Sequence, residues 1–260
     1  MPEIVGTSDW FPAAIRLSHS GKLIGGTRAA WATRRRGLVS TIPAEITLEM
    51  MRQSLTAAVV SDALDGLGHR RHSPLTSLRP MTVADRVLVG RCRTTLWADM
   101  AHPDPKPYEL ELQAVDACQP DDVLICAASG SNRSGIWGEL LSTAARNRGC
   151  VGAIVDGMVR DVRQMQEMDF AVWSLGTNLL DSLHRQRVID VNVPVELGGI
   201  EFRPGDLVIA DVDGVVVVPR ELEAEAIHRA WEKVHAENIT RDAIRGGMLA
   251  SEAYRKYGVL

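Results

Sequence analysis

The chain has 260 residues, of which 45% are hydrophobic and 24% charged, with a formal net charge of −4. A chain of this size can bury a substantial core as one large domain or two small ones. The charge balance argues against a nucleic-acid-binding protein. No apolar run reaches the roughly 18 residues of a membrane span, and we expect no secretory signal peptide.

The four cysteines predict a protein of a reducing compartment. They show no CxxC spacing, and most lie in apolar, strand-like or helical settings: Cys92, Cys118, Cys126 and Cys150. This pattern favours buried free thiols over a zinc site or a disulfide framework. We therefore expect a cytoplasmic protein.

Residues 1–44 differ in composition from the rest. Six basic residues outnumber two acidic ones, and glycines interrupt any periodicity. We interpret this segment as an irregular, basic N-terminal extension, with a surface-wrapping arm or an upstream-start artefact favoured over a targeting presequence. No repeat or low-complexity tract follows, so residues 45–260 are predicted to form one domain.

Regular patterns begin after Pro43. The patterns predict one helix that starts at Thr47 and a second that starts at Ser61, its N-cap. A long strand follows over residues 87–97, then a proline-rich loop over 98–106 and an amphipathic helix over 108–117. His69 and His72 lie three residues apart beside two arginines. We expect them in a solvated basic turn rather than in a metal site.

A first strand-to-helix corner spans residues 123–147. A buried strand over 123–128 is followed by a glycine-rich loop over 129–138 and a helix over 139–147. The N-terminus of such a helix offers free backbone N–H groups and the positive end of its dipole, so it can bind an anion. No GK[ST] sequence is present, and a carboxylate fits as well as a phosphate. The alternative is a plain connection without a ligand.

A second corner follows over residues 151–173. A strand over 151–155 is predicted to end at the Asp156-Gly157 turn, and Arg160 and Asp161 precede a short helix over 162–168. Two interpretations remain open. Asp161 caps its helix and pairs with Arg160, or both side chains bind a ligand, because α/β folds place ligands at such corners.

The rest of the chain reads as strands and a long helix. We expect a strand over 188–195, turns over 198–206, a hairpin of strands 207–211 and 215–218, and helices over 221–246 and 251–257. Asp211 and Asp213 are interpreted as turn-forming residues rather than as a metal pair.

These segments together resemble the RraA-like family, which includes the class II 4-hydroxy-4-methyl-2-oxoglutarate/4-carboxy-4-hydroxy-2-oxoadipate aldolases. The resemblance covers roughly residues 45–260 and is carried by residues 61–64, 138–141, 149–161 and 204–219 and by the tail 241–260. It implies an α/β fold, a β/β/α sandwich of the swivelling-domain type, here with an irregular N-terminal extension and a long C-terminal helix. It also implies a homotrimer or hexamer with active sites between subunits.

The resemblance also implies roles for the two corners. Asp161 would ligate Mg²⁺ or Mn²⁺, and Arg160 would bind the 2-oxo oxygen of the substrate. The pyruvyl carboxylate would be bound by backbone groups around the helix start: Gly138, Leu140 and Leu141.

Two glutamates complete the implied metal shell. Where the aldolases carry an aspartate that holds metal-bound water, this chain has Glu139, one methylene longer. Because of this difference the substrate class and the catalytic base stay open. A glutamate from a neighbouring subunit completes the shell in the aldolases, and Glu237 is the candidate here.

The implied activity is that of a metal-dependent lyase. It would cleave a 4-hydroxy-2-oxo acid to pyruvate through a metal-stabilised enolate, with oxaloacetate decarboxylation as a side activity. A lysine Schiff base is disfavoured because none of the four lysines lies in a corner: Lys22, Lys106, Lys233 and Lys256. The alternatives are a lyase for a sugar-acid-derived 2-oxo acid and a non-catalytic protein that regulates a ribonuclease. A methyltransferase finds no support, since no strand-GxGxG-helix loop is present.

Overall fold

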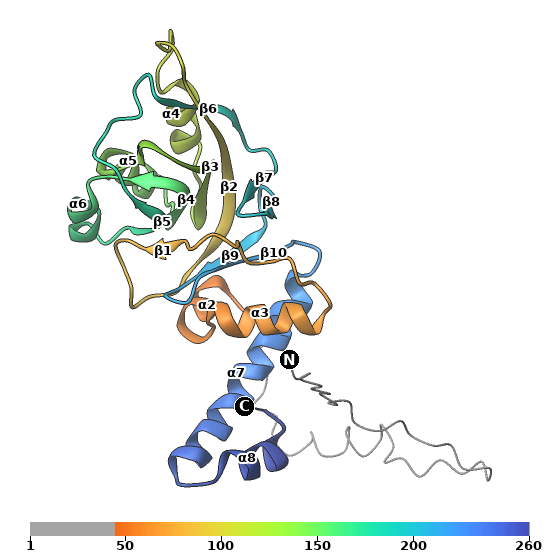
Figure 1. Cartoon of the computed structure of the whole chain (residues 1–260). Coiled ribbons are helices and arrows are strands. Elements are labelled where there is room, and N and C mark those ends of the chain that lie inside the picture. The colour runs from red at the N-terminus through yellow and green to blue at the C-terminus, as the bar shows by residue number, and fades with distance from the viewer. Residues whose placement is uncertain (1–44, 260) are drawn as a thin grey trace, which may run out of the picture. The chain divides into compact units, whose positions relative to one another are not determined.

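The computed structural model describes residues 45–259 (Figure 1); the predicted N-terminal extension lies outside them. The core of the described part is a sheet of eight strands in the order β1-β5-β4-β3-β2-β9-β10, with β6 also paired to β2. Its strands are β1 (Arg79–Pro80), β2 (Leu88–Asp99), β3 (Asp122–Trp137), β4 (Gly152–Val159), β5 (Ala171–Thr177), β6 (Gln186–Val191), β9 (Leu207–Ala210) and β10 (Val215–Val218).

The centre of the sheet is parallel. Strands β2, β3, β4 and β5 pair in parallel, and the connections between them contain α4 (Glu109–Asp116), α5 (Glu139–Asn147) and α6 (Val162–Glu167). Along β3, Ile125 packs in the core on one face and Leu124 in the core on the other. Because both faces are buried, the strand reads as a continuous apolar run rather than an alternating one.

Three groups of elements pack against the sheet and bury its apolar side chains. Helices α4, α5 and α6 cover one face of the sheet, and the hairpin of β7 (Val195–Leu197) and β8 (Ile200–Phe202) packs on the other (Figure 1). Helices α2 (Leu48–Ser54), α3 (Ala57–Gly66) and the long α7 (Glu223–Arg245) pack against β9 and β10, and α8 (Ala250–Tyr257) follows. The predicted β/β/α sandwich and long C-terminal helix are confirmed.

Helix α3 begins a full turn earlier than predicted. Thr56, not Ser61, is its N-cap, and the Thr56 hydroxyl accepts from the amide of Val59 at 3.3 Å. The Asp211 carboxylate accepts from the amide of Ala57 at 2.7 Å. Thr56 and Ser61 are both suitable N-cap residues. The further contact that fixes the start at Thr56 comes from Asp211, 154 residues away, so the local sequence does not distinguish the two.

The strands at both corners are longer than predicted. β3 continues through the expected glycine-rich loop to Trp137, and β4 continues past Gly157 to Val159. The two extensions pair with each other through three shifts in register. The predicted turn at Asp156-Gly157 is therefore wrong, and the left-handed residue of this corner is Asp161, at φ 55°. The predicted strand over 188–195 is divided between β6 and β7, and β8 lies within the predicted turns.

Smaller expectations have mixed outcomes. His72 is buried rather than solvated, because its ring nitrogens lie 2.8 Å from Ser61 Oγ and 2.7 Å from the carbonyl of His69. The four cysteines are free and buried, as predicted. The carboxylate of Asp211 accepts from the amide of Asp213 at 2.9 Å, which confirms a turn-forming role. Among residues 45–259, no helix has the length and apolar character needed to cross a membrane.

Candidate active site

The N-terminus of α5 presents unpaired backbone amides. Gly138 is the N-cap and forms no side-chain cap, and the first amide, that of Glu139, lies 3.4 Å from the Asp161 carboxylate. The amides of Leu140 and Leu141 make no hydrogen bond to any residue in the described range 45–259. Free donors and the positive dipole end together form a site for an anion.

Asp161 is held in an uncommon backbone conformation that turns its side chain away from its own helix. It sits in the left-handed region and makes no cap hydrogen bond to α6. Its Oδ2 instead faces Glu139 N and lies 3.6 Å from Arg160 Nε. The capping-box interpretation of Asp161 is therefore wrong, whereas the predicted pairing with Arg160 is present. A strained residue of this kind is a candidate functional position.

Glycines make room for this arrangement. A Cβ at Gly138 would lie 2.6 Å from Oδ2 of Asp161, and a Cβ at Gly135 would lie 2.4 Å from the carbonyl oxygen of Asn178. Gly138 thus lets the carboxylate approach the start of α5. Gly135 lets the segment after β5 lie against β3, and its amide donates to the carbonyl of Leu180 at 2.9 Å.

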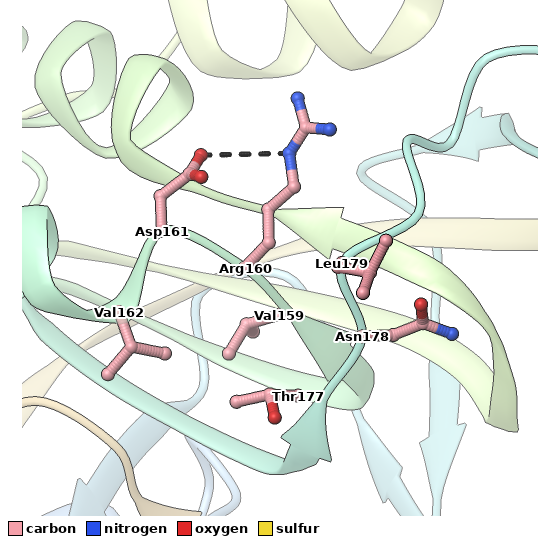
Figure 2. Close-up of a pocket in the computed structure, with 7 residues that line it drawn as sticks. All are labelled: Val159, Arg160, Asp161, Val162, Thr177, Asn178 and Leu179. Carbon is pink, nitrogen blue, oxygen red and sulfur yellow. Dashed lines mark ion pairs between the residues drawn. The ribbon is translucent and has the colours of Figure 1, made fainter.

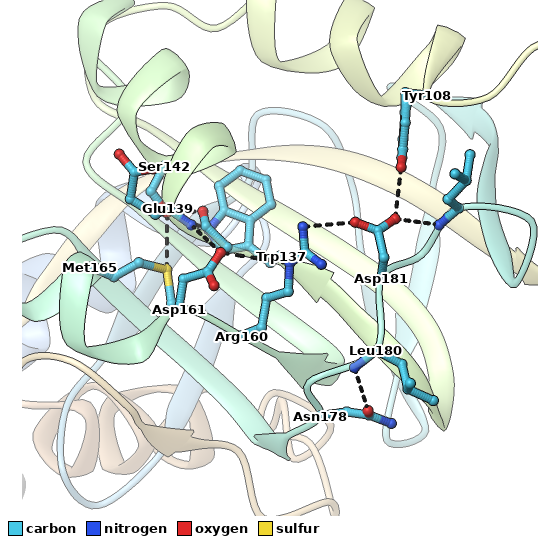
Figure 3. A network of polar contacts seen from close by, with 12 residues as sticks. Tyr108, Trp137, Glu139, Ser142, Arg160, Asp161, Met165, Asn178, Leu180 and Asp181 are labelled. Carbon is cyan, nitrogen blue, oxygen red and sulfur yellow. Dashed lines mark hydrogen bonds and ion pairs between the residues drawn. The ribbon is translucent and has the colours of Figure 1, made fainter.

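Arg160 is held between two carboxylates. Its terminal nitrogen lies 2.8 Å from Asp181 Oδ2, on the opposite side from Asp161 (Figure 3). The other oxygen of Asp181 accepts from Tyr108 Oη at 2.7 Å and from the amide of Leu183 at 2.6 Å. The guanidinium is therefore fixed in place by a chain of polar contacts that reaches α4.

This chain of contacts shifts the ionisation of its members. Burial opposes the ionised form of Asp181, but the hydrogen bonds from Tyr108 and Leu183 and the charge of Arg160 lower its pKa below the ordinary value. Burial and the hydrogen bond to Asp181 raise the pKa of Tyr108 to about 12. Asp181 is therefore an anion and Tyr108 a neutral phenol at physiological pH.

These residues enclose a cleft of about 260 Å³. Its walls come from the start of α5, from the corner after β4, from α4 and from the segment after β5: Tyr108, Glu111, Leu112, Gly135, Ile136, Trp137, Gly138, Leu140, Leu141, Arg160, Asp161, Asp181 and Ser182. Five of the seven predicted site residues line it: Gly138, Leu140, Leu141, Arg160 and Asp161. Their roles stay predictions.

A second hollow of about 590 Å³ shares Arg160 and Asp161 with the cleft. It is lined by residues 159–162 and 177–179 (Figure 2). Thr177, Asn178 and Leu179 belong to the end of β5 and the segment after it. The ion pair of Arg160 and Asp161 therefore borders both hollows.

The other two predicted site residues do not line the cleft. Glu139 lies at its edge, with Oε1 accepting from the Thr143 hydroxyl at 2.8 Å. Glu237 lies on α7 and pairs with Lys233 at 3.6 Å and with Arg241 at 3.7 Å. Within residues 45–259, no group of three His, Cys, Asp or Glu side chains is placed to hold a metal ion.

Sequence reasoning missed the buried acid of the cleft. Glu111 is 6% exposed, and burial, reinforced by the charge of Asp181 and opposed by Arg160, raises its pKa to about 8. A sequence signal existed, because positions 111, 114, 115 and 118 repeat with helical spacing and the last three are apolar. Asp181 and Tyr108 gave no such signal.

Comparison with known proteins identifies the family of the chain. The family model RraA-like, described as Aldolase/RraA, matches residues 57–217. The chain belongs to the RraA-like family. A Halalkalibacterium halodurans protein named "Putative 4-hydroxy-4-methyl-2-oxoglutarate aldolase" is 32% identical over 212 residues, which cover 81% of this chain and 95% of the relative.

Two solved structures share the fold. An uncharacterized protein from Pseudomonas syringae is 27% identical with a TM-score of 0.68, covering 79% of this chain and 95% of its own. Streptomyces coelicolor RraAS2, described as an unusual member of the RNase ES inhibitor RraA protein family, is also 27% identical, with a TM-score of 0.66. That match covers 76% of this chain and 99% of the neighbour. The predicted family is confirmed.

Proposed function

We propose that this protein is a divalent-metal-dependent carbon–carbon lyase that releases pyruvate from a 4-hydroxy-2-oxo acid through an enolate. The observation that carries the proposal is the single cleft that joins Arg160, Asp161 and the free amides at the start of α5. The name of the H. halodurans relative supports the reaction class. The proposal concerns C1 to C4 of the substrate, which 4-hydroxy-4-methyl-2-oxoglutarate and sugar-acid-derived 2-oxo acids have in common. Oxaloacetate is a side substrate, because its decarboxylation gives the same enolate.

The chain's own groups bind the reacting half of the substrate. The amides of Leu140 and Leu141 donate to the C1 carboxylate at the positive end of α5. Arg160 faces the C2 oxygen, where negative charge develops as the C3–C4 bond breaks. Because Asp181 and Asp161 already fix the guanidinium, it stabilises that charge without reorganisation.

The Asp161 carboxylate suits a hard divalent cation. Its Oδ1 makes no hydrogen bond to any residue of the described part, and its side chain remains 39% exposed. Mg²⁺ takes one or two protein carboxylates and keeps several waters. When bound there, Mg²⁺ or Mn²⁺ supplies a Lewis acid for the 2-oxo group. Glu139 and, from a second copy of the chain, Glu237 are the proposed further members of the site.

Proton transfer completes the reaction. Cleavage requires that the C4 hydroxyl lose its proton, that the C3–C4 bonding pair move toward the C2 oxygen, and that C3 then accept a proton to give pyruvate. Glu139 is our candidate for taking the first proton, because it projects from the helical turn whose amides bind C1. Its Oε1 accepts from Thr143, and Oε2 makes no hydrogen bond within residues 45–259.

The first test removes the guanidinium and the metal. Pyruvate release from oxaloacetate and from 4-hydroxy-4-methyl-2-oxoglutarate is measured with Mg²⁺ or Mn²⁺ and with EDTA. We expect EDTA to abolish turnover, and Arg160→Ala to lower kcat by roughly 10²–10³-fold, as for a removed oxyanion donor. Arg163→Ala is the matched control, since Arg163 is exposed and pairs with Glu167 on the outside of α6. Near-normal turnover by Arg160→Ala contradicts the proposal.

A second variant tests the geometry of the corner. Gly138→Ala places a methyl group 2.6 Å from Oδ2 of Asp161 and so displaces the carboxylate. We expect a loss of about 10²-fold in kcat, the scale of a displacement near 1 Å. Gly66→Ala makes the same change within α3, where the nearest atom lies 4.0 Å away, and should leave turnover intact. Equal activities for both variants would show that the approach of Asp161 to α5 is not needed.

Regulation of a ribonuclease is the second candidate function. The observation that favours it is the likeness to S. coelicolor RraAS2 and to the family named in its description. It predicts inhibition of RNase E or RNase ES by stoichiometric amounts of the protein, which Arg160→Ala retains. A purified ribonuclease assay with and without the chain decides between inhibition and no effect.

A further inference from the structure

The cleft has two chemically different ends. One end holds Asp161 and the free amides of α5. The other holds Tyr108, the N-cap residue of α4, Glu111 of α4, and Asp181 of the segment after β5. Figure 3 shows Tyr108 and Asp181 on the far side of Arg160 from Asp161. We refer to Tyr108, Glu111 and Asp181 as the acidic wall. If the 2-oxo acid half occupies the α5 end, the remainder of the substrate lies against this wall.

Glu111 is a buried acid without a partner. Its side chain lines the cleft at 6% exposure, yet it makes no hydrogen bond to any residue in the range 45–259. The residues whose charges act on it or respond to it are Asp181, Arg160, Tyr108 and Cys126. With a pKa of about 8, Glu111 is a neutral carboxylic acid near pH 7. It then offers both a donor and an acceptor to whatever fills the cleft.

The acidic wall has no unpaired positively charged side chain among the described residues. Of the described residues that line the cleft, Arg160 alone carries a positive charge, and it already pairs with Asp161 and Asp181. A substrate carboxylate at the wall would face the anion of Asp181 without a counter-charge. Such a juxtaposition of like charges disfavours a ligand strongly. A hydroxyl group meets no such penalty and satisfies the unpaired acid.

We propose that the acidic wall is a specificity subsite that binds an uncharged, hydroxyl-bearing end of the substrate and disfavours a second carboxylate. This rests on the proposed function, because that function places the 2-oxo acid half at α5. The subsite favours hydroxylated, sugar-acid-derived 2-oxo acids over dicarboxylic ones such as 4-hydroxy-4-methyl-2-oxoglutarate.

A matched pair of substrates tests the subsite. 4,5-Dihydroxy-2-oxopentanoate gives pyruvate and glycolaldehyde, and 4-hydroxy-2-oxoglutarate gives pyruvate and glyoxylate; the two differ only in whether C5 is a hydroxymethyl or a carboxylate. We expect kcat/KM at pH 7 with Mg²⁺ to favour the hydroxymethyl substrate by about 10–100-fold, as for a like-charge contact. Equal values, or a preference for the dicarboxylate, overturn the proposal.

Two variants separate the charge effect from the hydrogen bond. Leu112 is 51% exposed and lines the cleft, so Leu112→Arg adds a positive charge there without burying it. We expect the ratio of kcat/KM for the two substrates to shift about 10-fold toward the dicarboxylate. Leu75→Arg, at a residue 92% exposed that does not line the cleft, is the control. Glu111→Met removes the donor at similar volume and should lower kcat/KM for the hydroxymethyl substrate alone by about 10-fold. Unchanged ratios in both variants contradict the assignment.

Failure of the reaction is distinguishable from failure of the subsite. If neither substrate yields pyruvate, the proposed function fails. Calorimetry with two ligands that lack the C4 hydroxyl then tests whether the acidic wall still prefers a hydroxyl group to a carboxylate. Tighter binding of 5-hydroxy-2-oxopentanoate than of 2-oxoglutarate supports it. Tighter or equal binding of 2-oxoglutarate, or binding of neither, overturns it.

Discussion

At the scale of single residues, the cleft depends on the position of Arg160 and Asp161 beside the free amides at the start of α5. The family resemblance led us to expect Arg160 and the amides of Leu140 and Leu141 at one site. The structure gives the physical reason, because both groups follow neighbouring parallel strands, β4 and β3, whose carboxyl ends meet at one edge of the sheet. The left-handed Asp161 was not expected, because only the approach of α5 to its carboxylate explains it. Asp181 reaches Arg160 across 21 positions of sequence, a distance over which no periodicity acts.

Glu111 should make the stability of the protein fall as pH rises. Its pKa of about 8 in the folded state lies above the ordinary 4.5, so the folded state binds more protons between these values. The free energy of unfolding therefore falls from about pH 5 to pH 8, by up to roughly 1.4 kcal/mol for each unit of pKa shift. Urea unfolding at several pH values measures the slope. Glu111→Gln cannot titrate and should lose this part of the slope; an identical pH profile in the variant contradicts the assignment.

At the scale of elements, the type of element was easier to predict than its limits. Helices α4, α5 and α7 and the hairpin of β9 and β10 follow from hydrophobic spacing and turn residues within each segment. The extensions of β3 and β4 do not, because each is a strand only through pairing with the other across register shifts. A glycine-rich sequence such as 129–138 has no preference of its own that would predict this pairing.

Asp211 links two such elements, and its loss should destabilise the fold. The residue follows β9, is buried, and accepts from Ala57 N at the start of α3 as well as from Asp213 N in the turn. Asp211→Ala leaves a buried amide without an acceptor, so we expect a loss of about 1–3 kcal/mol in the free energy of unfolding. Asp213→Ala, at an exposed position of the same turn, should cost less than about 0.5 kcal/mol. Urea denaturation of the two variants gives the comparison, and equal losses would remove Asp211 from this role.

At the scale of the whole molecule, the surface around the cleft is unusually apolar for an exposed region. Large leucines stand exposed along the walls of both hollows and beside Asp181: Leu112, Leu140, Leu179, Leu180 and Leu183. Exposed apolar side chains gathered around a functional site mark a binding surface. This feature supports the predicted homotrimer or hexamer with sites between subunits, which stays a proposal.

A single substitution on this surface tests the assembly and the site together. Leu179 is 85% exposed and lines the second hollow beside Arg160 and Asp161. If a second copy of the chain covers it, Leu179→Asp buries an unpaired charge at the interface, so we expect light scattering after gel filtration to show a smaller assembly. Lyase activity should fall with the mass, because the proposed metal shell takes Glu237 from the second copy. Leu75→Asp introduces the same charge at a site away from both hollows and should change neither mass nor activity. A Leu179→Asp protein that keeps the wild-type mass would place the interface elsewhere and leave Glu237 without its proposed role.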